Sequence, residues 1–167
     1  MNLSPGQAFV QGLYHVYLLH TATIDELNGW VGALPSIGRQ GVSFAISHSQ
    51  EAYTRITDEL YSQLLDREAD AQGQAAFIQA LQNGATEEQV IAAMLSSAEF
   101  AARANALVGM PGTDSNLNFV RALYKKILGR TGESAAEDNS WLAALPSFGK
   151  TAVVTAFLQS QEFRGDY

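Results

Sequence analysis

The fold is decided by residues 119–163, which read FVRALYKKILGRTGESAAEDNSWLAALPSFGKTAVVTAFLQSQEF. Apolar residues three and four positions apart predict an amphipathic helix that ends at Gly129-Arg130. After a short acidic turn, a second helix carries Trp141 and is expected to stop at Pro146. A third helix follows Gly149 and runs into a Ser-Gln-Glu-Phe tail. This stretch therefore predicts a unit of three helices joined by short turns.

The same plan recurs near the N-terminus. Trp30 matches Trp141, and the two positions are 111 residues apart. Two further motifs match at this spacing: Leu-Pro-Ser-x-Gly at 34–38 and 145–149, and Ser-Gln-Glu at 49–51 and 160–162. Self-similarity of this kind is typical of proteins built from helical repeats.

A looser copy lies between these two. Arg67 matches Arg130, and Glu99 matches Glu162, in both cases 63 residues apart. No window shows the sustained alternation of apolar and polar residues that is typical of strands. We therefore predict an all-α fold of three similar helical units, each with three to four helices, packed into a single domain over residues 1–167. The expected repeats, called first, second and third below, span residues 5–52, 53–108 and 115–167.

Composition narrows the class of protein. The 167 residues are 47% hydrophobic, which is enough to bury a core within one domain. The net charge of −7 disfavours nucleic acid and anionic membrane surfaces as partners. Because the chain has no cysteine, disulfides, thiolate metal ligands and cysteine nucleophiles are excluded. We find no signal-peptide pattern and no stretch near the ~20 apolar residues of a membrane span, so we expect no membrane insertion.

The two tryptophans are the first candidates for a functional role. Trp30 and Trp141 suit stacking on a sugar ring if they are exposed, and anchoring a helix if they are buried. Each lies four residues before a leucine, Leu34 or Leu145, so the two side chains share a helix face. This spacing favours the structural interpretation, in which each tryptophan is mostly buried and anchors its own unit.

The recurring arginines and glutamates form the second candidate set. Arg67 and Arg130 follow the end of a helix, where a guanidinium can bind an anion or satisfy free carbonyl groups. Each arginine can also pair with the recurring acid of its repeat, Glu99 or Glu162. We favour a structural role for these residues. His20 takes this place in the first repeat, so an arginine is not obligatory.

No pattern of catalytic or metal-binding residues is evident. The acidic turn that starts at Asp66 lacks the bidentate glutamate of a calcium loop, because Phe77 occupies the twelfth position. His15, His20 and His48 have no spacing that suggests a metal site or a catalytic triad. The chain also has no phosphate-binding loop and no nucleophile elbow. We therefore expect no enzyme activity, no metal and no cofactor.

The stretch FVRALYKKILGRTGESAAEDNSWL and the Ser-x-Glu-Phe tail resemble a bacterial family, the domain of unknown function 4214. The resemblance is close over 118–163 and partial over 57–100, and over 8–52 it is limited to the first helix, the tryptophan and the tail. A more distant similarity is to the phycobilisome linker domain. The resemblance implies an accessory module of large secreted or surface proteins, some with calcium-binding repeats and some beside carbohydrate-active domains.

These inferences lead to one expected function and two alternatives. We expect a non-catalytic interaction module of a secreted or cell-surface bacterial protein, with a protein or a glycan as its partner. The alternatives are a carbohydrate-binding module and an intracellular linker or scaffold protein, so a cytoplasmic location stays open. Exposure of Trp30 and Trp141 would separate the first two functions.

Overall fold

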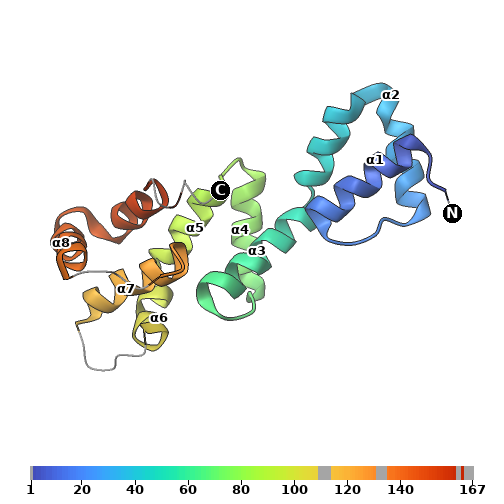
Figure 1. Ribbon diagram of the computed structural model, residues 1–167. Helices are drawn as coiled ribbons and strands as arrows, with labels where there is room; N and C mark the ends of the chain where they lie inside the picture. The colour runs from blue at the N-terminus through green and yellow to red at the C-terminus, as the bar shows by residue number, and fades with distance from the viewer. Residues whose placement is uncertain (1, 109–113, 131–134, 161–162, 164–167) are drawn as a thin grey trace. The chain divides into compact units, whose positions relative to one another are not determined.

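The protein is built from helices, as Figure 1 shows for the computed structural model. The structure describes residues 2–108, 114–130, 135–160 and 163. Over these residues it contains eight α-helices, one π-helical segment and no strand, which confirms the predicted all-α class. In chain order the elements are α1 (Pro5–Leu13), η1 (Tyr14–Leu18), α2 (Ile24–Ser47), α3 (Gln50–Leu65), α4 (Ala71–Gln82), α5 (Glu87–Leu95), α6 (Ala98–Val108), α7 (Ser115–Ile127) and α8 (Ala135–Leu158).

The helices divide into two compact units. The N-terminal unit comprises Met1–Glu59 and Asp70–Asn83, and the C-terminal unit comprises Leu60–Ala69 and Gly84–Tyr167. The boundary falls within α3, whose last residues belong to the C-terminal unit. The packing of three repeats into a single domain, which we expected from the sequence, stays a prediction.

In the N-terminal unit, one apolar core joins the first helices. Ser4 caps α1 by accepting a hydrogen bond from the Gln7 amide, and Pro5 occupies the first turn. Thr23 and Glu26 form a capping box at the start of α2, as the sequence predicts. The buried core residues are Val10, Tyr14, Leu18, Ala22, Leu27, Val42, Ile46 and Ala52. These side chains come from α1, η1, α2 and the start of α3, so the core holds these elements together.

In the C-terminal unit, α7 packs against both α6 and α8. The Phe119 ring of α7 meets Phe100 of α6 edge-on, with 5.8 Å between centroids. Tyr124 of α7 meets Phe157 of α8 edge-on at 4.8 Å. Aromatic pairs in this geometry contribute ~0.5–1.5 kcal/mol beyond the burial of their area. The aromatic residues of α7 therefore join its two neighbours.

α2 and α8 share a sharp bend. In each helix a proline, Pro35 or Pro146, lies inside the helix, so the sequence-based expectation that the proline ends it is wrong. The break comes three residues later, at Gly38 (φ 68°, ψ 177°) and Gly149 (φ 78°, ψ 168°). Proline has a helical φ and removes only one backbone donor, so the helix continues for another turn. The chain leaves the helix where glycine permits a conformation that other residues rarely adopt.

By length and composition alone, one described helix qualifies as a candidate membrane span, the Asp138–Leu158 part of α8. The core helix of a soluble protein passes the same test. Here the break at Gly149 interrupts the helix and Lys150 places a charge near its middle, whereas a span needs ~20 continuous helical residues and few charges. About 28% of the segment is buried, including Val153 and Val154, as expected of a helix with one face on a core.

Candidate functional site

A tyrosine and a cation form the same pair at the ends of α3 and α7. The Arg67 guanidinium lies over the Tyr61 ring, 4.7 Å from its centroid. Arg130 lies over the Tyr124 ring at 4.7 Å as well. In both pairs the arginine follows its tyrosine by six residues. A cation over an aromatic face contributes ~0.5–1 kcal/mol at an exposed site, so each pair helps to fix the chain just beyond its helix.

The residue before each cation turns the chain out of its helix. Leu19, Asp66 and Gly129 have φ angles of 60°, 49° and 64°, in the left-handed region that favours glycine. These residues directly precede His20, Arg67 and Arg130, respectively. Only the third repeat has a glycine here. The turn is strained by about 1–2 kcal/mol at Leu19 and by less at Asp66, because aspartate tolerates the left-handed region.

Leu19→Gly is expected to stabilise the N-terminal unit by about 1 kcal/mol, because it removes left-handed strain. The cost of losing the side chain is small, since Leu19 is 66% exposed. Urea denaturation of the full chain measures the change. The matched control is Gly129→Ala, where an added Cβ meets nothing within 4 Å, and it should destabilise by about 1 kcal/mol. A loss of stability in Leu19→Gly would show that Leu19 makes a contact that outweighs the strain.

The second repeat contains a bidentate ion pair. Arg67 Nε and Nη2 donate to the two carboxylate oxygens of Glu99 at 2.6 and 2.8 Å. Arg67 Nη1 also donates to the carbonyl oxygen of Glu68 at 2.8 Å. Arg103, one helical turn after Glu99, brings a second guanidinium to 3.2 Å from the same carboxylate. The structure therefore brings Arg67 and Glu99 together, and their pairing ties the end of α3 to the first turn of α6.

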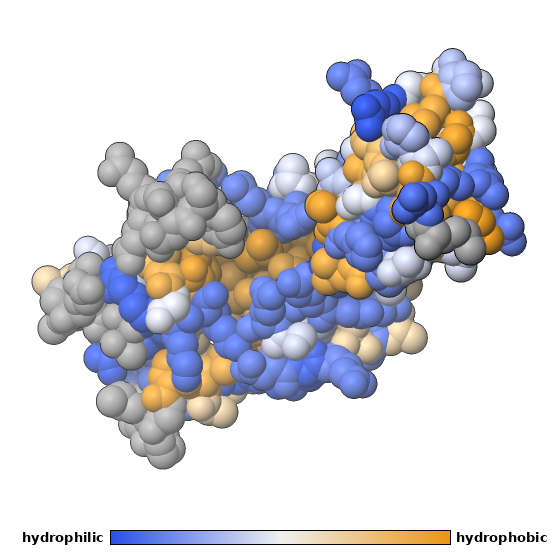
Figure 2. Space-filling model, turned by 45° about the vertical axis from the view of Figure 1, so that its right-hand side comes forward, coloured by the Kyte–Doolittle hydropathy of each residue, from blue (hydrophilic) through white to orange (hydrophobic). Residues whose placement is uncertain are grey.

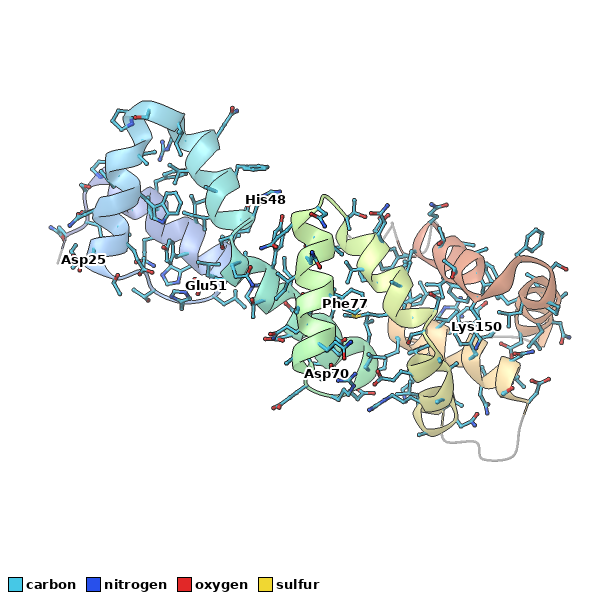
Figure 3. All side chains as sticks on the ribbon, turned by 180° about the vertical axis from the view of Figure 1, so that it is seen from behind. Asp25, His48, Glu51, Asp70, Phe77 and Lys150 are labelled. Carbon is cyan, nitrogen blue, oxygen red and sulfur yellow. The ribbon has the colours of Figure 1, made fainter. Side chains whose placement is uncertain are left out.

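The first repeat has the same arrangement with different residues. The His20 ring meets Tyr14 edge-on, with 5.5 Å between centroids. His20 Nε2 lies 2.5 Å from Oε1 of Glu51, which sits at the start of α3 (Figure 3). In the third repeat the corresponding acid is Glu162, which lies outside the described residues.

A serine precedes each of these acids by two positions and makes the same backbone contact in all three repeats. The side-chain oxygens of Ser49, Ser97 and Ser160 accept hydrogen bonds from the backbone amides three residues later, at 3.1, 3.1 and 3.2 Å. At Glu51 and Glu99 the Ser-x-Glu motif is therefore a helix N-cap followed by an acid in the first turn, where the helix dipole favours negative charge. The sequence showed that the motif recurs but did not reveal this role.

Sequence reasoning missed one arginine after each of the recurring acids Glu51 and Glu99. Arg55 Nε donates to the carbonyl oxygen of Tyr17 at 2.8 Å, and Arg103 Nη1 donates to that of Leu65 at 2.7 Å. Both carbonyls lie at the end of a helix, where backbone acceptors need partners from elsewhere. The available signal was spacing, because each arginine follows the recurring glutamate by four residues.

Both tryptophans are half-buried and bind a tyrosine hydroxyl. Trp30 Nε1 donates to the Tyr14 hydroxyl at 3.1 Å, and Trp141 Nε1 donates to the Tyr124 hydroxyl at 3.0 Å. The Trp141 ring also packs on Phe157, with 4.5 Å between centroids. Each indole thus makes its polar contact within its own repeat, which is the arrangement expected of an anchoring residue.

A pocket of about 410 Å³ lies beside Trp141 in the C-terminal unit. Its lining includes three aromatic residues and three polar ones, Tyr124, Trp141, Phe157, Arg130, Ser140 and Ser160. Small-ligand sites have a similar volume and a similar mixture of apolar walls with few polar groups. In the first repeat, Gly29 and Ile46 occupy the positions of Ser140 and Phe157. The third repeat therefore has a hydroxyl and an aromatic ring that the first repeat lacks.

The pKa values of Tyr14 and Glu26 in the first repeat are shifted from their usual values. Burial raises the pKa of the Tyr14 hydroxyl, so it stays protonated at neutral pH. The pKa of the Glu26 carboxyl is lowered, because the side chain and the backbone amide of Thr23 donate to it.

In the part of the chain that the structure describes, no group of three or more acidic or histidine side chains is placed to hold a metal ion.

Comparison with known families matches more than half of the chain. The model of the family described as a domain of unknown function (DUF4214) matches residues 57–104 and 109–167. The chain belongs to this family. The two adjacent matches correspond to the second and third repeats, as two successive DUF4214 units would. Comparison with curated proteins gives no match.

The first repeat lies outside the two DUF4214 matches. It nevertheless has the tryptophan–tyrosine hydrogen bond, the bend at Gly38, the left-handed turn at Leu19 and the serine cap at Ser49. The left-handed turn and the serine cap recur in both DUF4214 units, and the tryptophan–tyrosine bond and the bend recur in the third repeat. These shared features support the predicted relation between the first repeat and the two DUF4214 units. Family membership assigns no activity, so function has to be argued from the surface.

Proposed function

We propose that this DUF4214 protein is a non-catalytic interaction module of a secreted or cell-surface bacterial protein, and that its partner is a protein. The observation that carries the proposal is a pair of exposed apolar residues at one repeat position. Ile37 is 49% exposed and Phe148 is 72% exposed. Both lie directly before the glycine that bends α2 or α8.

Ile37 and Phe148 are exposed at the same position of two repeats, so chance is a poor explanation of their exposure. A single exposed apolar residue is ordinary in a soluble protein. Here the exposed residue recurs 111 positions apart, at the tip of the same bend. Figure 2 shows apolar side chains among polar ones on one face of the molecule. Phe44 of α2 is a further exposed aromatic residue, with 63% of its surface accessible. Aromatic residues are enriched at protein interfaces, and larger exposed apolar patches mark interaction sites.

The polar residues that recur have partners inside the fold, which supports a non-catalytic role. Arg67 pairs with Glu99, and His20 contacts Glu51. Catalytic groups, in contrast, must be placed to contact a substrate. These charges therefore help to hold the first two repeats together, and the exposed bends are the surface that we propose for a partner.

Photo-crosslinking in the producing bacterium tests the proposal. A photoreactive phenylalanine analogue at position 148, or at position 37, is expected to form the same discrete protein adduct. The control is the analogue at the exposed residue Thr151, which lies just beyond the bend and is expected to form none. Fractionation of the culture should place the protein outside the cytoplasm. Equal crosslinking at all three positions would remove the support for an interface, and a cytoplasmic location would favour the intracellular scaffold.

A second candidate function is glycan binding, and the pocket beside Trp141 favours it. The pocket holds about 410 Å³ and combines aromatic rings with hydroxyl groups, a mixture that suits a sugar ring. Ser140→Phe should fill the pocket from an exposed position without removing the hydrogen bond between Trp141 and Tyr124. If a glycan screen finds a ligand, this variant should lose it while stability changes by no more than about 0.5 kcal/mol.

A further inference from the structure

We infer that His20 and Glu51 form a pH-dependent latch in the N-terminal unit. The latch closes the first repeat in acid and loosens it when the imidazole loses its proton. The inference goes beyond the proposed interaction role, because it concerns how the first repeat responds to its surroundings. It rests on a comparison of the first repeat with the second and on the two hydrogen bonds of the His20 ring.

The comparison shows that His20 replaces a permanent charge. Arg67 lies over Tyr61 and pairs with Glu99 in the second repeat. In the first repeat, His20 takes the arginine's place beside its own tyrosine, and Glu51 takes the place of Glu99. An arginine keeps its charge at every pH in which the fold persists, whereas a histidine loses its charge near neutral pH. The same contact is therefore constant in the second repeat and titratable in the first.

Both nitrogens of the His20 ring face an acceptor. Nε2 lies 2.5 Å from Oε1 of Glu51, and Nδ1 lies 3.1 Å from the carbonyl oxygen of Thr21. Neither acceptor can donate a proton when Glu51 is ionised. Only the imidazolium has a hydrogen on both nitrogens, so only the charged form makes both bonds. Loss of the proton leaves one lone pair directed at an oxygen, which weakens the contact.

The other groups that face His20 act in the same direction. Glu51 approaches from α3, Glu26 lies within electrostatic reach on α2, and the Tyr14 ring on η1 is uncharged at neutral pH. The hydrogen bond to the Thr21 carbonyl, followed by the one to Glu51, raises the pKa of His20 above its usual 6.5, against a small effect of burial. Because the folded pKa exceeds the unfolded one, the stabilisation is complete below about pH 6.5 and is lost as the pH rises through the folded pKa.

Opening of the latch would also change a neighbouring surface. Glu51 lines a groove of about 660 Å³ together with other residues of α3, among them Arg55, and with Leu18 and Leu19 at the end of η1. While the latch is closed, the Glu51 carboxylate is paired with His20. When His20 is neutral, this carboxylate gains freedom and adds an unpaired negative charge to the groove. The expected response to a rise in pH is thus a looser first repeat with a more acidic groove.

The test uses the full chain and follows His20 by NMR together with hydrogen exchange at the buried residues Ala22 and Leu27. In the wild type, His20 should titrate above 6.5, and the opening constant, corrected for the intrinsic rate, should rise about two- to fivefold between pH 6 and 8, the range for an exposed ion pair. In His20→Arg this rise should disappear. Glu51→Gln should lower the His20 titration midpoint, and His48→Gln, the control, should behave as the wild type.

Two results would overturn the latch. One is an unshifted His20 titration that Glu51→Gln leaves unchanged. The other is a rise in opening with pH that persists in His20→Arg, because that variant keeps a charge at this position throughout. His20→Arg copies a residue that already serves in the second and third repeats, so we expect it to fold.

Discussion

Trp141→Ala is expected to lower the unfolding free energy of the C-terminal unit by about 3 kcal/mol. The indole donates to the Tyr124 hydroxyl at 3.0 Å and packs on Phe157 at 4.5 Å. Truncation removes both contacts and leaves a cavity beside the existing pocket. We expect a loss at the low end of the ~3–5 kcal/mol typical of buried aromatic residues, because Trp141 is half-buried. The loss is a large part of the ~5–15 kcal/mol that stabilises a domain.

Urea denaturation of the full chain measures this loss, and Trp141→Phe is the matched control. The phenylalanine keeps a ring against Phe157 but cannot donate to Tyr124, so it should cost about 1 kcal/mol. Wild-type stability in Trp141→Ala would mean that the tryptophan does not anchor the third repeat. If that variant also lost a glycan ligand found by screening, glycan binding would become the leading function.

Arg67→Ala is expected to destabilise the C-terminal unit by about 2 kcal/mol. The substitution removes two charge-assisted bonds to Glu99, one bond to the Glu68 carbonyl and the contact with the Tyr61 ring. We expect no larger loss of stability, because 25% of the Arg67 side chain and 36% of the Glu99 side chain are exposed to water. Arg103 also remains beside the Glu99 carboxylate in this variant.

A double-mutant cycle with Glu99→Gln separates the ion pair from the ring contact. The coupling energy should reach about 1 kcal/mol, since the bidentate geometry exceeds that of an ordinary surface pair. Arg67→Lys should recover only part of the loss, because an ammonium group cannot make the two parallel bonds. A coupling energy near zero would assign the role of Arg67 to Tyr61 and the backbone alone.

Much of the fold follows from local signals in the sequence. The capping boxes at Thr23 and Thr86 mark helix starts that the structure places at the next residue. The pairing of Arg67 with the recurring acid was one of the interpretations that spacing allowed. Local signals work here because caps and helix periodicity depend on residues within one or two turns.

The features that escaped prediction depend on contacts between distant residues or on strain. The left-handed conformations of Leu19 and Asp66 run against residue preference, and tertiary contacts such as the ion pair of Arg67 hold them in place. Asp138 is 4% exposed and pairs with Arg121, although an acid near a helix start normally suggests an exposed residue. No pattern in the sequence signals a burial of this kind.

The course of α3 has a consequence for how such repeats can be cut or duplicated. This helix carries Glu51, which contacts His20 of the first repeat, and Tyr61, which receives Arg67 of the second. The DUF4214 match begins at residue 57, between these two side chains. A gene fragment that starts or stops at that point would keep Glu51 with His20 and Tyr61 with Arg67, but it would divide α3 between two pieces. An excised first repeat therefore needs the first turn of α3, because that turn carries the acid that contacts His20.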